Sequence, residues 1–242
     1  MEPIFFQDLG IVAYNVAWDY QESLLKANLE QKSKKFVNGI ESADFVPDTI
    51  HHLLFCEHPH VYTLGKSGHI ENLLVNNERL KEMNVTFYKT NRGGDITYHG
   101  PGQIVGYPIL DLERFTTDLG KYMRNLEEVI IRTIAEYGII ADRLPGSTGV
   151  WLDPDNPARA RKICAMGVRS SRWVTMHGFA LNVNTDLSYF NYIVPCGITD
   201  KAVTSMEKEL GRIVDEQEVK DKLLVHFAQV FDAEIITNNN GN

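Results

Sequence analysis

The sequence lacks a long hydrophobic run: nowhere do about 20 apolar residues follow one another, as a membrane-spanning helix would need. Residues 1–6 also lack the basic start and long apolar core of a signal peptide, and the arginine-rich pattern of a transit peptide. Cysteine is scarce, with only Cys56, Cys164 and Cys196, and three thiols cannot all pair with one another. We therefore expect reduced thiols, a cytoplasmic location and no membrane partner, so that one cysteine can serve chemistry rather than structure.

Positive charge is also in short supply, because 24 basic side chains stand against 32 acidic ones and give a net charge of −8. A general nucleic-acid partner is therefore not expected, although a local basic patch remains open. The 242 residues are 43% hydrophobic and 23% charged, the balance of an ordinary globular protein. No Ser-, Pro- or Gly-rich linker divides them. We predict a single domain over residues 1–236 and a flexible tail over residues 237–242.

Hydrophobic spacing predicts an α+β fold, a mixed β-sheet flanked by helices. Strands that come in runs, with helices before, between and after them, are typical of this class, whereas strict β-α-β alternation is absent. We expect residues 96–98 and 103–110 to pair as a hairpin across the turn at residues 99–102. The predicted helices are residues 14–36, 77–83, 118–137 and 216–231, and the other predicted strands are residues 50–56, 61–64, 85–88, 149–152, 162–168, 173–176 and 179–183.

A glycine-rich loop, Arg92-Gly93-Gly94-Asp95, is the first candidate for ligand binding. Adjacent glycines let a backbone approach a ligand closely, and the neighbouring arginine can bind an anion or a carbonyl. A tight turn with a surface arginine is the alternative. A second glycine-rich turn with His99 follows after one short strand, so we expect the two turns to form a pocket wall. No Gly-Lys-Ser/Thr follows, which excludes a P-loop.

Lys162 and Cys196 are the candidates for catalysis. On an alternating strand Lys162 shares one face with Cys164 and Met166, and a lysine partly removed from water can exchange protons near neutral pH. The alternative is a strand-end lysine whose amine reaches solvent. Cys196 lies between Pro195 and Gly197, in irregular backbone that suits a nucleophile, although a buried structural thiol is also possible there. Cys164 fits the buried structural role better.

A zinc site is weighed and not predicted. His52, Cys56, His58 and His60 would share a face if their segment stayed extended, which is a soft ligand set. Leu54 shares that face, Pro59 interrupts the strand, and no Cys-x-x-Cys pair exists.

Three segments together resemble one known family. They are residues 92–103 (RGGDITYHGPGQ), residues 162–169 (KICAMGVR) continuing to residues 177–183 (HGFALNV), and residues 195–198 (PCGI), with residues 57–65 fitting as well. The chain is similar to the lipoyl(octanoyl) transferases, which move an octanoyl group from octanoyl-acyl carrier protein to a lysine of a lipoyl domain. The resemblance implies a fold like the catalytic domain of biotin and lipoate protein ligases.

The resemblance also implies a Cys196–Lys162 dyad, a thioester intermediate on Cys196 and no cofactor, because exchange of one thioester for another needs no ATP. It implies acceptors among the lipoyl domains of 2-oxoacid dehydrogenase E2 subunits and the glycine cleavage H protein. Asp95, Cys56 and His60 depart from the usual family pattern, which leaves the substrate detail open. The substrate pocket it implies comprises Arg92, Gly93, Gly94, Asp95, Ile96, Thr97, Tyr98, His99, Ala165, Met166, Gly167, Gly178, Phe179 and Ala180.

Two other interpretations stay open. An ATP-dependent lipoate or biotin protein ligase would not need Cys196, and a non-catalytic acyl-binding protein would use neither residue of the dyad. A thiol protease is less favoured, since no Cys–His signature surrounds Cys196. Between residues 159 and 172 five basic side chains occur without an acidic one, and these could steer an acidic carrier protein. They are Arg159, Arg161, Lys162, Arg169 and Arg172.

Overall fold

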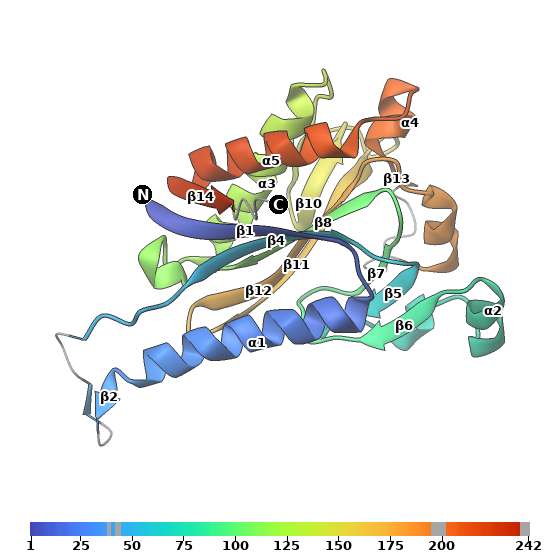
Figure 1. Ribbon diagram of the computed structural model, residues 1–242. Helices are drawn as coiled ribbons and strands as arrows, with labels where there is room; N and C mark the ends of the chain where they lie inside the picture. Colours follow the sequence, from blue (N-terminus) through green and yellow to red (C-terminus); the bar gives the residue numbers. More distant parts are fainter. Residues whose placement is uncertain (38–39, 42–44, 195–201, 238–242) are drawn as a thin grey trace, which may run out of the picture.

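The computed structural model describes residues 1–37, 40–41, 45–194 and 202–237. Within this part of the chain, nine strands form one mixed sheet with helices on both faces (Figure 1). A second, three-stranded sheet packs beside it. The α+β prediction is therefore confirmed. No helix in these ranges is long and apolar enough to cross a bilayer.

The main sheet has the strand order β14-β1-β4-β8-β12-β11-β10-β9, with β13 paired to β11. The smaller sheet has the order β6-β5-β7, and β2 pairs with β3. The strands are β1 Glu2–Ile11, β2 Phe36–Val37, β3 Ile40–Glu41, β4 His51–Glu57, β5 Val61–Leu64, β6 Thr86–Lys89, β7 Ile96–His99, β8 Gln103–Ile109, β9 Asp142–Leu144, β10 Ser147–Leu152, β11 Arg161–Ser171, β12 Val174–Asn182, β13 Ala202–Val203 and β14 Ala233–Thr237. The helices are α1 Tyr14–Ser33, α2 Asn77–Glu82, α3 Leu119–Ala135, α4 Met206–Leu210 and α5 Glu216–Phe231, with 3₁₀ turns at Ile70–Asn72, Leu112–Arg114 and Leu187–Tyr192.

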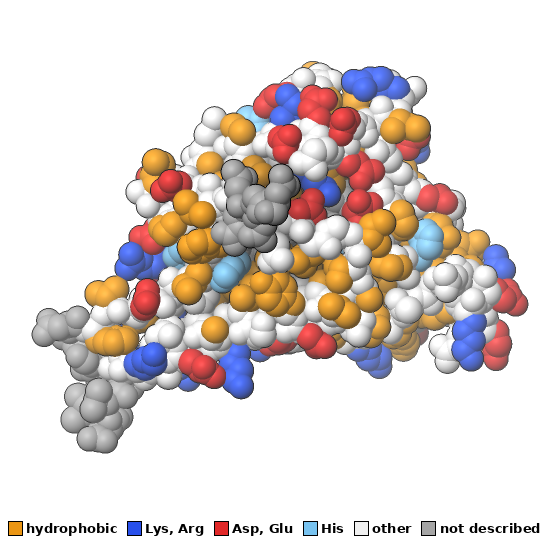
Figure 2. All heavy atoms as spheres, viewed as in Figure 1, with side chains coloured by type: hydrophobic (Ala, Val, Ile, Leu, Met, Phe, Trp, Pro, Cys, Tyr) orange, Lys and Arg blue, Asp and Glu red, His pale blue; other side chains and the backbone are white. Residues whose placement is uncertain are grey.

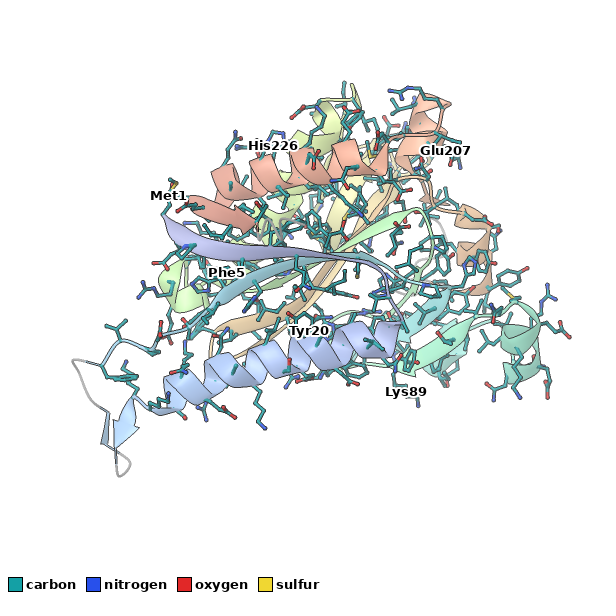
Figure 3. The ribbon with its side chains drawn as sticks, in the orientation of Figure 1. Met1, Phe5, Tyr20, Lys89, Glu207 and His226 are labelled. Carbon is teal, nitrogen blue, oxygen red and sulfur yellow. The ribbon has the colours of Figure 1, made fainter. Side chains whose placement is uncertain are left out.

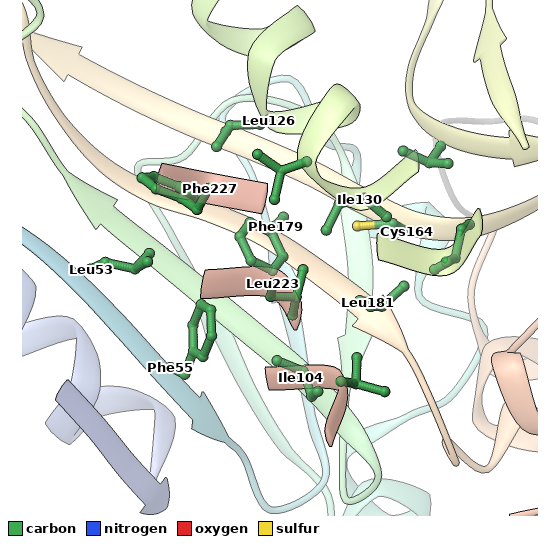
Figure 4. Packing of buried hydrophobic residues seen from close by; sticks show 14 of the residues in the cluster. Leu53, Phe55, Ile104, Leu126, Ile130, Cys164, Phe179, Leu181, Leu223 and Phe227 are labelled. Atoms are coloured by element: carbon green, nitrogen blue, oxygen red, sulfur yellow. The ribbon is translucent and has the colours of Figure 1, made fainter. Parts of the chain in front are cut away.

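Helices α3 and α5 cover one face of the main sheet, and α1 covers the other (Figure 1). In Figure 3 the labels Tyr20 on α1 and His226 on α5 mark these two layers. The larger core lies under α3 and α5, where side chains recurring every three or four residues, such as Leu126 and Ile130, meet Phe179 of β12 and Phe227 (Figure 4). The face under α1 has its own, smaller cluster, and three of its members, Val105, Tyr107 and Ala180, also line a cavity.

Most predicted elements are confirmed. Strand β5 and helix α5 have the predicted bounds, whereas α1 ends at Ser33, three residues early. Strands β1 and β14, near the two ends of the chain, were not predicted. They pair in parallel from Glu2↔Ala233 to Phe6↔Thr237, so Thr237 belongs to a strand and not to the flexible tail. Residues 238–242 lie outside the described residues.

The predicted hairpin of residues 96–98 and 103–110 is wrong. Strand β7 pairs antiparallel with β5, from Val61↔His99 to Leu64↔Ile96, whereas β8 lies between β4 and β12 in the main sheet. The glycine-rich turn between them carries the chain from one sheet to the other. Gly102 has a φ of +77°, and a side chain there would meet the backbone of Asn184. Only glycine therefore fits at this position of the turn.

The break predicted between residues 176 and 179 is also wrong, because β12 runs through it. His177 has a φ of 58°, yet the ladder to β11 continues through Val168↔His177 and Gly167↔Gly178. Gln21 of α1 accepts a hydrogen bond from the His177 backbone N–H at 2.9 Å and so supports this unusual conformation. The distortion brings the His177 side chain into the wall of the cavity described next.

Candidate active site

A cavity of about 500 Å³ lies between the main sheet and the three-stranded sheet. This volume is within the range of about 300–1,000 Å³ typical of small-molecule sites. Alternate residues of β8, namely Gln103, Val105 and Tyr107, form one side of its floor. Ala180 of β12 lies opposite Val105 and next to Ala165 of β11, and these small side chains leave room for a ligand.

The structure brings the first two motif segments, residues 92–103 and residues 162–169 with 177–183, to this one cavity, whereas the third, residues 195–198, lies outside the described residues. Tyr98 is the exception among the predicted pocket residues. It lies on the other face of β7, where its hydroxyl is 2.7 Å from His60 Nδ1 and its ring stacks on Tyr189. The predicted residues that line the cavity are Arg92, Gly93, Gly94, Asp95, Ile96, Thr97, His99, Ala165, Met166, Gly167, Gly178, Phe179 and Ala180.

Arg92 organises the glycine loop from inside. The side chain is only 8% exposed, and its guanidinium donates to the carbonyls of Thr63, Gly93 and Asp95 and to the Thr63 hydroxyl, at 2.6–3.3 Å. The planar fork of arginine suits this set of acceptors. Gly93 N–H in turn donates to the Val168 carbonyl at 2.9 Å, which fixes the loop to β11. Arg92 is thus a buried support of the loop and not a surface arginine.

Lys162 lies at the cavity on β11, half-buried, with its Nζ 4.6 Å from the centre of the Trp151 ring. The prediction that Lys162 and Cys164 share a face is wrong for this strand. Cys164 is fully buried in the larger core and is not among the cavity residues. The pairing of β10 with β11 shifts register between Val150↔Cys164 and Trp151↔Lys162, and this irregularity breaks the simple alternation. Burial raises the pKa of the Cys164 thiol, consistent with the expected structural role.

Cys196 lies outside the described residues, so its distance from Lys162 is not part of the structure. The chain on either side of this segment is described. Before it, Val194 N–H donates to the Asn72 carbonyl at 2.8 Å, and Asn72 Nδ2 donates to the Asp95 carboxylate at 2.6 Å. After it, Val203 of β13 pairs with Lys162 and lines the cavity.

Three buried, neutral histidines lie at or behind the cavity wall: His99 and His177 line the cavity, and His58 contacts the lining residue Tyr107. Burial is the main cause: it lowers the pKa of His58 to about 4 and that of His177 to about 3, and it lowers the pKa of His99 well below 6.5. Arg92 adds to the effect on His99 and His177. His58 Nδ1–H donates to the Val12 carbonyl, so its Nε2 accepts from the Tyr107 hydroxyl, each at 2.7 Å. Neutral rings keep this end of the cavity compatible with an uncharged ligand.

The four side chains considered as zinc ligands, His52, Cys56, His58 and His60, do not form a metal site in the described residues. His58 uses both ring nitrogens in the hydrogen bonds above, and the His60 ring stacks on Tyr189 at 4.2 Å. Cys56 is buried beneath α1, where burial raises the pKa of its thiol. Across the described ranges no three His, Cys, Asp or Glu side chains are grouped as metal ligands.

The predicted basic rim is largely paired with acidic side chains. Arg161 contacts Asp153 and Glu209, Arg159 also contacts Asp153, and Arg169 is 2.7 Å from Glu22. The face in Figure 2 likewise shows acidic and basic side chains next to one another. These pairs reduce the local positive field that the sequence suggested.

Residues 13–228 match the family model described as the lipoyl protein ligase A/B catalytic domain. The chain belongs to this family. Curated relatives named octanoyltransferase cover nearly its whole length. The protein from Christiangramia forsetii is 60% identical over 230 residues, 95% of this chain and 96% of its own. The protein from Flavobacterium johnsoniae is 59% identical over 96% of this chain and 98% of its own, and the one from Parabacteroides distasonis is 52% identical over 96% and 100%.

Solved structures place the fold of this lipoyl protein ligase family member among lipoate protein ligases. An archaeal lipoylation system from Thermoplasma acidophilum, described as a bipartite lipoate protein ligase and its E2 lipoyl domain, has a chain that superposes with a TM-score of 0.66. It is 16% identical and covers 99% of this chain and 88% of its own. A lipoate-protein ligase A bound with ATP has a TM-score of 0.65 at 16% identity, covering 98% and 90%. At these identities the likeness shows the shared fold.

Several cavity residues of this family member were not singled out from the sequence. Tyr14 comes from the start of α1, where its ring stacks on His99 at 6.0 Å and burial raises its pKa to about 12. Met123 comes from α3 and Phe190 from the turn before residue 195. For Gln103, Val105 and Tyr107 a signal existed, because they alternate along a predicted strand that begins in the resembling motif. For the others, only the fold brings them to the cavity.

Proposed function

We propose that this protein transfers an octanoyl group to a lysine of a lipoyl domain, as part of protein lipoylation. The relatives named octanoyltransferase, at 52–60% identity over nearly the whole chain, support this activity. The observation that carries it is the position of Lys162 at a cavity whose floor is lined by Val105, Ala165 and Ala180. Such a cavity suits an apolar acyl chain, and the Lys162 amine beside it is the group that exchanges protons.

The chemistry proceeds through Cys196 and Lys162 in two transfers. Lys162 accepts the proton of the Cys196 thiol, and the thiolate attacks the thioester carbonyl of octanoyl-acyl carrier protein. The carrier thiolate leaves and takes up the proton from Lys162, which is thereby neutral again, and octanoyl-Cys196 remains. The neutral ε-amine of the acceptor lysine then attacks this thioester and loses a proton to Lys162, and the Cys196 thiolate leaves. The second transfer drives the reaction, because an amide is more stable than a thioester.

The flanks of the Cys196 segment support its part in this proposal. Val194, two positions before Cys196 in the sequence, is held by its hydrogen bond to the Asn72 carbonyl. Phe190 and Val203, on either side of the segment, both line the cavity, and Val203 pairs with Lys162. We propose lipoyl domains of 2-oxoacid dehydrogenase E2 subunits and of the glycine cleavage H protein as acceptors, and the cytoplasm as the compartment.

Intact mass measured after incubation with octanoyl-acyl carrier protein, without ATP, tests the proposal. We expect the gain of one octanoyl group on Cys196, lost when an apo lipoyl domain is added. Cys196→Ser should abolish the adduct, and Lys162→Ala should slow both transfers. Transfer that depends on ATP and free octanoate, and that survives Cys196→Ser, would instead identify a ligase. Tight binding of the acyl group without any adduct or transfer would identify a non-catalytic acyl-binding protein.

A further inference from the structure

A continuous chain of buried polar side chains runs from the cavity wall to the backbone beside Lys162. His99 Nδ1 is 2.8 Å from Gln103 Oε1, and Gln103 Nε2 donates to Asn182 Oδ1 at 2.8 Å. Asn182 Nδ2 donates to the Thr204 carbonyl at 3.0 Å, and Thr204 N–H donates to the Lys162 carbonyl at 2.9 Å. The chain therefore crosses from β7 through β8 and β12 to the end of β13 and to β11.

The direction of every hydrogen bond in this chain is determined. The Thr204 carbonyl can only accept, so the amide nitrogen of Asn182 faces it and Asn182 Oδ1 faces Gln103. Gln103 Nε2 donates there and, at 3.2 Å, to the Tyr98 carbonyl. Gln103 Oε1 must then accept, which places the proton of neutral His99 on Nδ1. Neither amide can flip without opposing two donors or two acceptors.

Burial makes these bonds costly to break. His99, Gln103 and Asn182 are at most 6% exposed, and Thr204 is fully buried. A buried amide without its partner loses roughly 1–3 kcal/mol relative to the paired state. The hydrogen bond from Asn182 therefore holds Thr204 in place from the cavity side. Strand β13 itself holds it less, because it has only two residues and two pairs with β11.

We infer that Gln103 and Asn182 are positioning residues for acyl transfer, acting through Thr204 to hold Lys162 against the cavity. The inference rests on the proposed role of Lys162. Asn182 holds the strand that pairs with Lys162, and Gln103 fixes the orientation of the Asn182 amide. Both side chains also line the cavity, so a ligand that contacts them is held at a fixed position relative to the Lys162 amine.

Asn184 provides a matched control on the same segment. Its amide also holds distant backbone, because Nδ2 donates to the Val214 carbonyl and Oδ1 accepts from Val214 N–H, each at 2.9 Å. This second asparagine anchors the start of α5 and is not among the cavity residues. Asn184 Nδ2 also donates to Glu216 Oε1 at 2.9 Å, so Asn184→Ala removes three hydrogen bonds of a half-buried amide, and Asn182→Ala removes two of a buried one. Both variants therefore lose structural bonds, and only Asn182→Ala acts on Lys162.

The experiment measures octanoyl transfer and amide hydrogen exchange for the two variants and for Gln103→Met. We expect Asn182→Ala to lower kcat by about 10- to 100-fold, the effect of a misplaced group, with a smaller change in KM and an altered pH profile. Gln103→Met should lower kcat less, and it remains a test if Asn182→Ala does not fold. Asn184→Ala should leave kcat within about twofold while lowering stability to a similar degree.

Hydrogen exchange separates this inference from the proposed activity. Asn182→Ala should speed exchange of Thr204 N–H, and Asn184→Ala should speed exchange of Val214 N–H. Equal losses of kcat in the two asparagine variants, or unchanged Thr204 exchange in Asn182→Ala, would overturn the positioning role. If the wild-type protein forms no octanoyl adduct, the proposed function fails, and the exchange data still show whether Asn182 holds the partner strand of Lys162.

Discussion

Lys162 and Trp151 face each other as a directly paired couple on β11 and β10, with the amine nitrogen 4.6 Å from the indole ring centre. A cation over an aromatic face gains about 0.5–2 kcal/mol, depending on how far it is removed from water. The Trp151 ring is itself held by donation from Nε1 to the Ser147 carbonyl at 3.1 Å. The indole thus orients the amine at the cavity.

Trp151→Leu should therefore reduce the rate of enzyme acylation by several-fold beyond its effect on stability. Trp151→Phe keeps a ring under the amine and should retain most of the rate, although it loses the bond to Ser147. Single-turnover acylation and thermal unfolding, measured on both variants, separate the two effects. If Trp151→Leu and Trp151→Phe have equal acylation rates, the aromatic ring does not orient Lys162.

A methyl group on Gly167 should damage the cavity more than one on Gly93. A side chain at Gly167 would come within 2.7 Å of the Gly93 carbonyl oxygen and 3.3 Å of Arg92 Cδ, so the glycine loop would have to move. A side chain at Gly93 would meet only the Val168 carbonyl, at 3.2 Å. Overpacking of this kind costs about 1–3 kcal/mol. We expect kcat/KM to fall at least about tenfold for Gly167→Ala and only a few-fold for Gly93→Ala, and the reverse order would show that the loop is not rigid.

Arg92→Lys should unfold the protein more readily, because the guanidinium makes five hydrogen bonds from three nitrogens, whereas an ammonium has three donors on a single nitrogen. Leaving one or two buried acceptors without a donor costs about 2–4 kcal/mol. Arg169→Lys is the control, since its half-buried pair with Glu22 contributes about 0–1 kcal/mol. Urea titrations of both variants give the comparison. A loss for Arg92→Lys no greater than for Arg169→Lys would argue against a supporting role for the Arg92 guanidinium.

The sequence predicts the local elements of this fold well and their partners poorly. The regular apolar stripe of residues 216–231 gives both ends of α5 because periodicity and capping are local properties, as the Asp215 side chain bonding to Gln217 N–H illustrates. Turn formers at residues 99–102 correctly mark a change of direction. They carry no information on which sheet the next strand joins, so the predicted hairpin was wrong. The parallel pairing of β1 with β14 joins residues more than 200 positions apart, for which no local pattern exists.

The site follows a similar division. The glycine loop and the residues of β11 and β12 could be placed at one cavity because the motifs occur together in a known order. The orientation of single side chains could not, since a register shift next to Lys162 turns Cys164 into the core and a positive φ at His177 turns that ring into the cavity wall. Both depend on pairing with neighbouring strands. Tyr98 was misplaced for the same reason, because its face of β7 is decided by β5.

The buried histidines should make the protein sensitive to mild acid. His177 has a folded-state pKa of about 3, lowered mainly by burial and further by Arg92 and Arg169, against about 6.5 in the unfolded chain. Between these values the unfolded chain binds a proton that the folded one excludes, so folding stability is complete above pH 6.5 and falls as the pH drops below it. At pH 5.5 this difference amounts to about 1.4 kcal/mol for His177, and a similar amount for His58, whose folded-state pKa is about 4.

His177→Gln should reduce this acid sensitivity by one histidine. Urea unfolding of the wild type and the variant at pH 7.5 and 5.5 gives the measurement. The variant loses the bond to Asn91, at 2.7 Å in the wild type, and so should be less stable at both values. Its additional loss between pH 7.5 and 5.5 should nevertheless be smaller than that of the wild type by about 1.4 kcal/mol. An equal loss in the two proteins would mean that His177 takes up its proton in the folded state as readily as in the unfolded one, and is not held neutral in the cavity wall.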